Sequence, residues 1–213
     1  MKKKGVYLFS AAVLLSSCGL GGKDLANITN ADGAIGSIIN AATDTETITN
    51  IIYNVIGASK ITEEELLGTW RYESPGCAFT SSKLLAQAGG EVAAKSIENE
   101  LEKTFSKVGI NSYNTSFSFR KDKSFSAKIA GLPLEGTYTY NPEDGSIVFN
   151  SMLFSAKGYV VRNAQGISLV FDSKKLLDVL QNISLKSGNS AISSLGNLEK
   201  YLSSVRMGFD LMR

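Results

Sequence analysis

The chain has 213 residues, of which 22 are Lys or Arg, 20 are Asp or Glu, two are Cys and none is His. Without histidine, the chain has no Ser-His-Asp or Cys-His catalytic arrangement and no zinc site with an imidazole ligand. The nearly balanced charge provides no basic footprint for nucleic acid. We therefore expect no nucleic-acid partner, no metal site and no cofactor.

Residues 1–17 have the pattern of an export signal. Lysines at positions 2 to 4 precede an apolar run from Val6 to Leu15, which is about ten residues long and too short to span a bilayer. The residues LSSC at positions 15 to 18 match the lipobox, the sequence that bacterial lipoprotein signal peptidase recognises. The pattern predicts cleavage before Cys18, lipidation of its thiol, and stable anchoring to a membrane through two or three acyl chains.

Removal of residues 1–17 also changes the charge and the cysteine count. The mature chain keeps 19 Lys and Arg against 20 Asp and Glu, because three of the lysines belong to the signal. Cys77 is then left without a disulfide partner, and we expect a buried, unreactive thiol there. Gly19 is not the Asp that signals inner-membrane retention in some bacteria, which favours the outer membrane, with the chain facing the periplasm or the cell surface.

The mature chain begins with a tether and a helical lead. Residues 18–33 are rich in Gly, Asn and Asp and lack apolar periodicity, which is typical of a flexible tether. Residues 34–60 contain a short helical pattern and then a helix over 46–56, which the capping box of Thr43 and Glu46 precedes and Gly57 ends. This helix has an isoleucine-rich stripe and no Lys or Arg. We expect it to pack on the main domain; a protein partner is the alternative.

Residues 61–213 are expected to form one domain. The segment TEEE at 62–65 is a second capping box and predicts one helical turn, and LLGTWRYES at 66–74 predicts the first strand. Residues 82–108 then carry apolar side chains mostly three or four positions apart, which indicates an inserted helix ending at Gly109. The Gly89-Gly90 pair inside it predicts a kink or a close approach to another backbone.

Six strands follow in a hairpin series, and helices and a last strand complete the domain. Alternation of apolar and polar residues marks the strands at 114–121, 124–130, 133–141, 146–150, 154–162 and 166–172. The connections KDKS, AGLP, NPEDG and NAQG are turn sequences. Helices are predicted at 173–187 and 189–205, and a final strand at 206–213. Eight antiparallel strands with distant first and last members favour a closed barrel within an α+β, mainly β, fold, and an open sandwich is the alternative.

The first strand carries a recognisable signature. Gly68-Thr69-Trp70 is a G-x-W that resembles the signature of lipocalins, in which the tryptophan closes the bottom of the barrel beneath an arginine from the last strand region. Arg206 and Arg213 are the candidates for that arginine. The order of lipobox, helical lead, LLGTW, inserted helix and barrel strands is similar to uncharacterised lipocalin-like lipoproteins of Gram-negative, Bacteroidetes-type bacteria. This resemblance covers residues 62 to 213 and implies a fold and a location, without an established activity.

No set of residues predicts catalysis. Ser118 and Lys121 have S-x-x-K spacing, but they lie on a strand entering a hairpin turn, and the S-D-N and K-T-G sequences of β-lactamase-type enzymes are missing. The three glutamates at 63–65 belong to the capping box and do not form a carboxylate pair across a cleft. We therefore expect no enzymatic activity.

Two functions remain open. In the first, the lipid-anchored barrel holds a small apolar ligand, such as one acyl chain or a flat aromatic molecule, in a pocket near Gly136 and Tyr138. In the second, the barrel is packed and serves as a structural or protein-interaction scaffold in the outer membrane. A cavity of a few hundred cubic ångströms would favour the first function. The candidate ligand-binding residues are Trp70, Phe119, Phe125, Gly136, Tyr138 and Tyr140.

Overall fold

The computed structural model describes residues 55–57, 59–152, 155–187 and 205–213. Cys18, the predicted tether, most of the helical lead and nearly all of the predicted helix at 189–205 lie outside these ranges. The elements, in chain order, are α4 (Glu63–Leu66), β1 (Gly68–Phe79), α5 (Ser82–Ala88), α6 (Glu91–Lys107), β2 (Ser116–Phe119), β3 (Ser124–Ile129), β4 (Leu132–Asn141), β5 (Ser146–Ser151), β6 (Ser155–Arg162), β7 (Ile167–Asp172), α7 (Ser173–Ser187) and β8 (Val205–Met212).

The strands form a closed antiparallel barrel in the order β1 to β8. Each strand pairs with the next, and β8 pairs with β1 from Arg71 opposite Met212 to Phe79 opposite Val205. Closure through this last pairing confirms the predicted barrel and rules out the open sandwich. The alternation that predicted the strands is also visible in burial: Phe117, Phe119 and Phe125 are buried, while the serines between them are only partly covered.

The first strand is longer than the sequence predicted. It continues past residue 74 to Phe79 and has an irregularity in its pairing with β8 between Tyr72 and Ser74. Pro75 lies inside this extension, where β1 pairs with β8 on one side only. A strand position with no partner on its other side tolerates the missing N–H of proline, so Pro75 does not end the strand.

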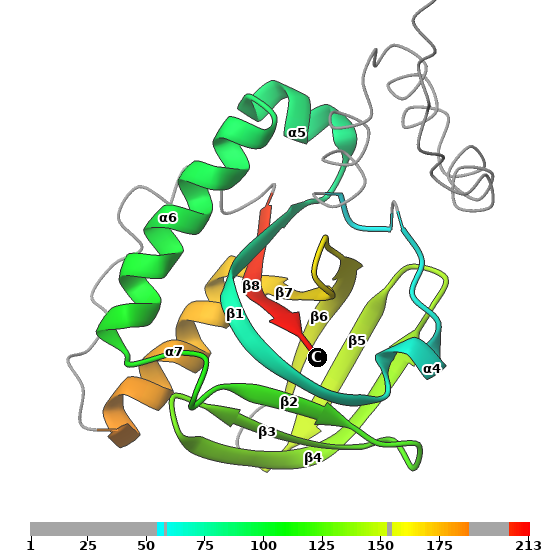
Figure 1. Cartoon of the computed structure of the whole chain (residues 1–213), viewed down its shortest axis with the longest axis vertical. Coiled ribbons are helices and arrows are strands. Elements are labelled where there is room, and N and C mark those ends of the chain that lie inside the picture. Colours follow the sequence, from blue (N-terminus) through cyan, green and yellow to red (C-terminus); the bar gives the residue numbers. More distant parts are fainter. Residues whose placement is uncertain (1–54, 58, 153–154, 188–204) are drawn as a thin grey trace, which may run out of the picture.

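The inserted segment forms two helices. Gly89 ends α5 with a φ of +107°, and Gly90, with a φ of +63°, precedes α6. These left-handed conformations break the predicted helix at the Gly89-Gly90 pair rather than bending it. Figure 1 shows α6 running alongside the curved β1 strand. Most of its apolar side chains enter the core, with Ile97, Leu101 and Phe105 fully buried, whereas Val92 in its first turn is exposed.

The end of the helical lead is described, and it is not helical. Val55 forms an isolated parallel bridge with Phe79, and the N–H of Ile56 donates to the carbonyl of Phe79 at 3.0 Å. The prediction that the helix extends to residue 56 is therefore wrong for its last two residues, because they extend the sheet edge at the end of β1 instead. Val55 is buried, so this end of the lead does pack on the barrel.

The helices cover different parts of the barrel. Figure 1 shows α4 at one end and α6 and α7 toward the other. The interior between these ends holds a single large cluster of buried apolar side chains from all eight strands and from α4 to α7. Among the described residues, no helix is both long enough and apolar enough to cross a membrane.

Candidate binding site at the α7 end of the barrel

Trp70 closes the α4 end. Its side chain is 5% exposed, and its Nε1 donates to the carbonyl of Leu66 at 2.8 Å. The guanidinium of Arg213 lies 4.6 Å from the centre of a Trp70 ring, a cation–π distance, and donates to the carbonyl of Leu67 at 3.1 Å. Arg213 is therefore the arginine of the lipocalin-type signature, whereas Arg206 lies near Asp172. Trp70 is a closing residue here and does not line a cavity.

Polar contacts hold α4 in place. Thr62 and Glu65 form the predicted capping box, and Arg162 donates to Glu65 at 2.7 Å. Burial alone would raise the pKa of Glu65, but hydrogen bonds from Thr62 and Arg162 hold that pKa below its usual value. The hydroxyl of Tyr140 donates to the carbonyl of Ile61 at 2.8 Å, and burial raises the pKa of Tyr140 to about 12. Tyr140 therefore supports the closed end.

The middle of the barrel is filled by rings. Phe119 and Tyr138 meet edge to face at 5.2 Å between ring centres, and Phe125 meets Phe149 in the same way at 4.9 Å. The hydroxyl of Tyr138 donates to the carbonyl of Arg120 at 3.1 Å. The phenol of Tyr138 therefore has a hydrogen-bond partner within the protein and does not need one from a ligand.

The cavity expected beside Gly136 and Tyr138 is not found there. A Cβ on Gly136 would lie 2.1 Å from the carbonyl oxygen of Asn150 and 3.0 Å from the ring of Phe125. Gly136 is therefore needed for the close approach of β4 to β5, and the space that its missing side chain leaves is already occupied. The predicted placement of the pocket is wrong for this reason.

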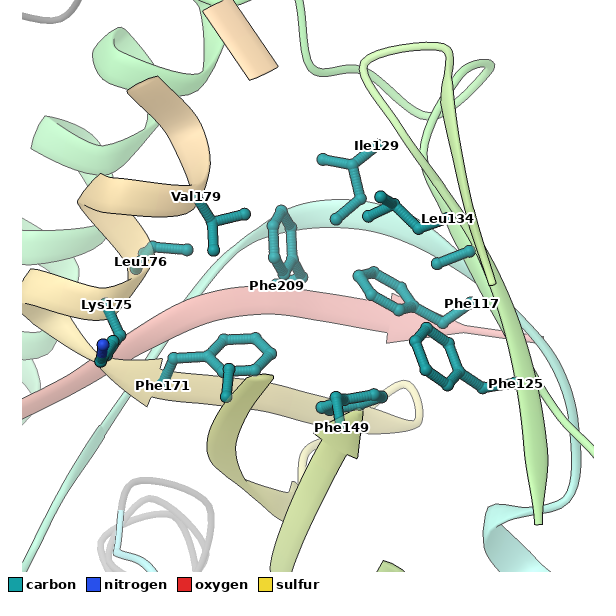
Figure 2. Close-up of a pocket in the computed structure, with 12 residues that line it drawn as sticks. Phe117, Phe125, Ile129, Leu134, Phe149, Phe171, Lys175, Leu176, Val179 and Phe209 are labelled. Atoms are coloured by element: carbon teal, nitrogen blue, oxygen red, sulfur yellow. The ribbon is translucent and has the colours of Figure 1, made fainter. Parts of the chain in front are cut away.

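An apolar pocket lies instead between the barrel interior and α7 (Figure 2). It leaves a cavity of only about 20 Å³, which is close to the space that one water molecule needs. Phe125 is the only one of the six candidate residues that lines it. The lining residues are Phe117, Phe125, Ala127, Ile129, Leu134, Phe149, Ala156, Phe171, Lys175, Leu176, Val179 and Phe209.

The start of α7 places three of these residues over the barrel. Asp172 accepts a hydrogen bond from the N–H of Lys174 at 3.1 Å, and the hydroxyl of Ser173 donates to the carbonyl of Val205 at 3.1 Å. The first contact begins the helix, and the second fixes its first turn against β8. Figure 2 shows Leu176 and Val179 facing the rings of the barrel. The spacing of Leu176, Val179 and Leu180 after a strand ending in Asp172 was the sequence signal for this covering helix, and the search for inward strand residues missed it.

Other groups with chemical potential lie outside the pocket. Cys77 is 3% exposed, as expected of a buried thiol, and burial raises its pKa well above the usual value. Asp210 on β8 accepts a hydrogen bond from the hydroxyl of Ser168, and burial raises the pKa of Asp210 to about 6. No three His, Cys, Asp or Glu side chains of the described ranges gather as a metal site requires.

Comparisons with known proteins give one family and one weak structural likeness. No curated protein matches the chain. A crystal structure of a DUF4847 family protein from Bacteroides vulgatus is 17% identical, covers 51% of this chain and 86% of its own, and has a TM-score of 0.30, too low to define a fold. The family model described as a lipocalin-like domain (DUF4923) matches residues 39–213, which include the whole barrel. The chain therefore belongs to this lipocalin-like family.

Proposed function

We propose that the protein is a lipid-anchored lipoprotein of the cell envelope whose barrel binds a small apolar ligand. Two features support the location. The lipobox ends at Cys18, and position 19 is Gly rather than the Asp that signals retention in the inner membrane. The outer membrane is the proposed site, with the barrel on its periplasmic or outer face. The lipocalin-like family supports the binding of a small ligand by the barrel.

One observation carries the binding proposal. The space between α7 and the barrel is lined by eleven apolar side chains and by a single polar one, Lys175. The α4 end, by contrast, is closed with polar contacts such as those of Arg162 with Glu65 and of Tyr140 with Ile61. An apolar, partly enclosed site with one polar group at its edge is the usual composition of a small-molecule site.

The small volume of the pocket implies that a ligand can bind only if the protein rearranges. A cavity of about 20 Å³ is far below the few hundred cubic ångströms that would favour ligand binding, and it does not hold an acyl chain or an aromatic ring. The ligand therefore takes the place of side chains that α7 now puts over the mouth, chiefly Leu176 and Val179. Binding is coupled to displacement of α7, and the ligand compensates by burying the apolar surface that α7 uncovers.

Native mass spectrometry of the protein released from its own envelope tests the proposal. We expect a non-covalent mass in addition to the covalent lipid anchor, lost on denaturation. Ala156 lines the pocket, so Ala156→Leu should abolish the added mass, while it destabilises the fold by about 1–3 kcal/mol. Ser155→Leu is the matched control, because Ser155 is exposed on the same strand.

A packed barrel that serves as a scaffold is the second candidate function. The interior favours it, since the rings of Phe119, Phe125, Tyr138 and Phe149 contact one another and leave little space. In that case the envelope protein carries no added mass, and a protein partner contacts the helices of the chain. Absence of any bound molecule in the wild-type protein would therefore reject the binding function and retain the scaffold.

A further inference from the structure

A second cluster of apolar side chains lies on the outside of the barrel wall. It consists of Ale78 on β1, Val161 on β6 and Val170 on β7, and we call it the outer cluster. The residue before each of them belongs to the interior cluster, so these three side chains point outward. All three are nevertheless 0% exposed. Outward-facing side chains are buried to this extent only when something covers the wall from outside.

The described residues cover only part of this wall. The apolar side chains that pack against the outer cluster are those of Tyr159 and Ile56. Tyr159 belongs to the wall itself, opposite Val170. Ile56 lies beside β1, and β8 and β7 separate β1 from β6. Three strand spacings are about 14 Å, so Ile56 does not reach across to Val161.

The segment that precedes Ile56 has the composition of a cover. It includes Ile48, Ile51 and Ile52, and residues 47–59 contain no charged side chain. Isoleucine side chains gain free energy when they leave water for an apolar surface. The lipocalin-like family model begins at residue 39 and therefore includes this segment together with the barrel.

The position of Ile56 brings this segment to the wall. The N–H of Ile56 donates to the carbonyl of Phe79 at the end of β1, and its side chain packs against the outer cluster. Residues 188–204 also lie outside the described ranges, and they precede Val205. The side chain of Val205 belongs to the interior cluster, so the described neighbour of that segment does not point to the outer wall.

We propose that residues 46–54 dock as a strap on the outer wall formed by β6, β7, β8 and β1. The isoleucine side chains of the strap cover the outer cluster. Gly208 of β8 lies opposite Val170 and has no side chain, which leaves room for the strap between β7 and β1. This contact is outside the barrel and independent of any ligand in the interior, so it goes beyond the proposed function. It also shortens the free chain between Cys18 and the barrel.

Thiol labelling of Val170→Cys tests whether the strap covers the wall. Cysteine behaves as a small apolar residue and can replace a buried valine. Protein purified from the envelope in detergent is treated with N-ethylmaleimide, and peptide mapping assigns each label to its cysteine. We expect slow labelling of this variant with the natural lead. Ile51→Asp in the same background should raise the rate about tenfold or more, because a charged side chain does not stay on an apolar wall.

Asn50→Asp is the matched control. It adds the same charge one position earlier, on the opposite side of the predicted helix from the isoleucine stripe, and should leave the labelling rate unchanged. Cys77 is an internal control for the fold, since it is buried beneath α6 on the other face of the wall and should stay unlabelled. If Ile51→Asp also exposes Cys77, Ile51→Ser takes its place, because it removes the apolar side chain without adding charge.

Three outcomes would overturn the strap. Rapid labelling of Val170→Cys with the natural lead would show that the wall is uncovered. Equally slow labelling in the Ile51→Asp and Asn50→Asp variants would show that another segment covers it, and faster labelling in Leu195→Asp would then identify residues 188–204. Protection that is lost on dilution would assign the wall to a second copy of the chain.

Discussion

The side chain of Asp210 restricts which residues can lie next to it on the barrel wall. A Cβ on Gly76 would lie 2.1 Å from its carboxylate, so the glycine of the SPGCAF segment is required where the side chain of Asp210 crosses β1. Ser168 donates a hydrogen bond to the same carboxylate. Burial nevertheless opposes its charge, and the nearby Glu98 acts in the same direction, which together raise the pKa of Asp210 to about 6.

The raised pKa predicts how stability depends on pH. The folded chain holds the Asp210 proton with a pKa of about 6, against 3.8 for an ordinary Asp, so it binds the proton more tightly than the unfolded chain does. The contribution of Asp210 to stability is therefore present below about pH 4 and is lost as the pH rises through 6. We expect Asp210→Asn, which keeps an acceptor for Ser168, to be more stable than wild type at pH 7, by at most about 3 kcal/mol.

Urea denaturation from pH 4 to pH 8 measures this difference. The advantage of Asp210→Asn should grow across the range and reach a plateau above pH 7. Asp122→Asn is the control. We expect it to be less stable than wild type at pH 7, because hydrogen bonds from Ser124 lower the pKa of Asp122 in the folded chain. An advantage of Asp210→Asn that is constant with pH would show that the carboxylate of Asp210 is not destabilised by burial.

At the scale of elements, α4 and the first strand depend on each other. The helix has only four residues and is too short to be stable alone, so its contacts with the barrel must hold it. Trp70 supplies one of these contacts, through its buried ring and its hydrogen bond to Leu66. Arg213, from the end of the chain, covers the same ring and so connects β8 to α4.

Removal of Trp70 should therefore open the closed end. We expect Trp70→Ala to lower the free energy of unfolding by about 3–5 kcal/mol, because it leaves a cavity under α4 and an unpaired carbonyl at Leu66. Met212→Ala is the comparison on β8, where the side chain is exposed and a change within about 0.5 kcal/mol is expected. Circular dichroism must follow the transition, since Trp70 is the only tryptophan. A loss below 1 kcal/mol would contradict the closing role.

Local patterns were sufficient to predict the elements. Alternation along FSF at 117–119 and turn sequences such as NPEDG depend on neighbours in the chain, so the strands and hairpins follow from the sequence. The capping box at Thr62 is local in the same sense. The sequence favoured a closed barrel over an open sandwich but did not decide between them. Closure depends on pairing between β1 and β8, which are separated by most of the domain.

The site could not be predicted in the same way. Whether Gly136 leaves a space depends on how closely Asn150 of the next strand approaches, and alternation does not contain that distance. The pocket also depends on α7 lying over the barrel, which is a tertiary contact between a helix and strands distant from it in the sequence. Phe125 lines the pocket because its side chain faces the barrel interior, and its role in ligand binding stays a prediction.

For the whole molecule, the two barrel ends have different chemistry. The α4 end is closed by ion pairs and hydrogen bonds, including Arg162 with Glu65 and Tyr140 with Ile61. The α7 end is closed by apolar contacts around a small cavity. Displacement of α7 costs the burial of a few side chains and the hydrogen bond of Ser173 to Val205, whereas opening the α4 end breaks several polar contacts and the Trp70 contact together. A ligand is therefore expected to enter at the α7 end.

The two cysteines allow lipidation and folding to be measured in one experiment. Lipidation converts the Cys18 thiol to a thioether, which leaves Cys77 as the free thiol of the mature chain. Cys77 is buried on β1 with its Sγ 3.6 Å from the carbonyl of Ala94 on α6, so a thiol reagent reaches it only when α6 separates from the barrel. We expect Ellman's reagent to detect no thiol in the native protein purified from the envelope and one per chain in guanidinium.

The full-length chain made by cell-free synthesis, without lipoprotein-processing enzymes, is the control. It retains both cysteines and should give two thiols per chain in guanidinium, whereas Cys18→Ala made in cells should give one. Two thiols in the denatured envelope protein would reject lipidation at Cys18, because a thioether does not react. A rapid reaction in the native protein would instead contradict the packing of α6 against β1, since burial both shields Cys77 and raises its pKa. The native and denatured readings therefore test the anchor and the fold independently.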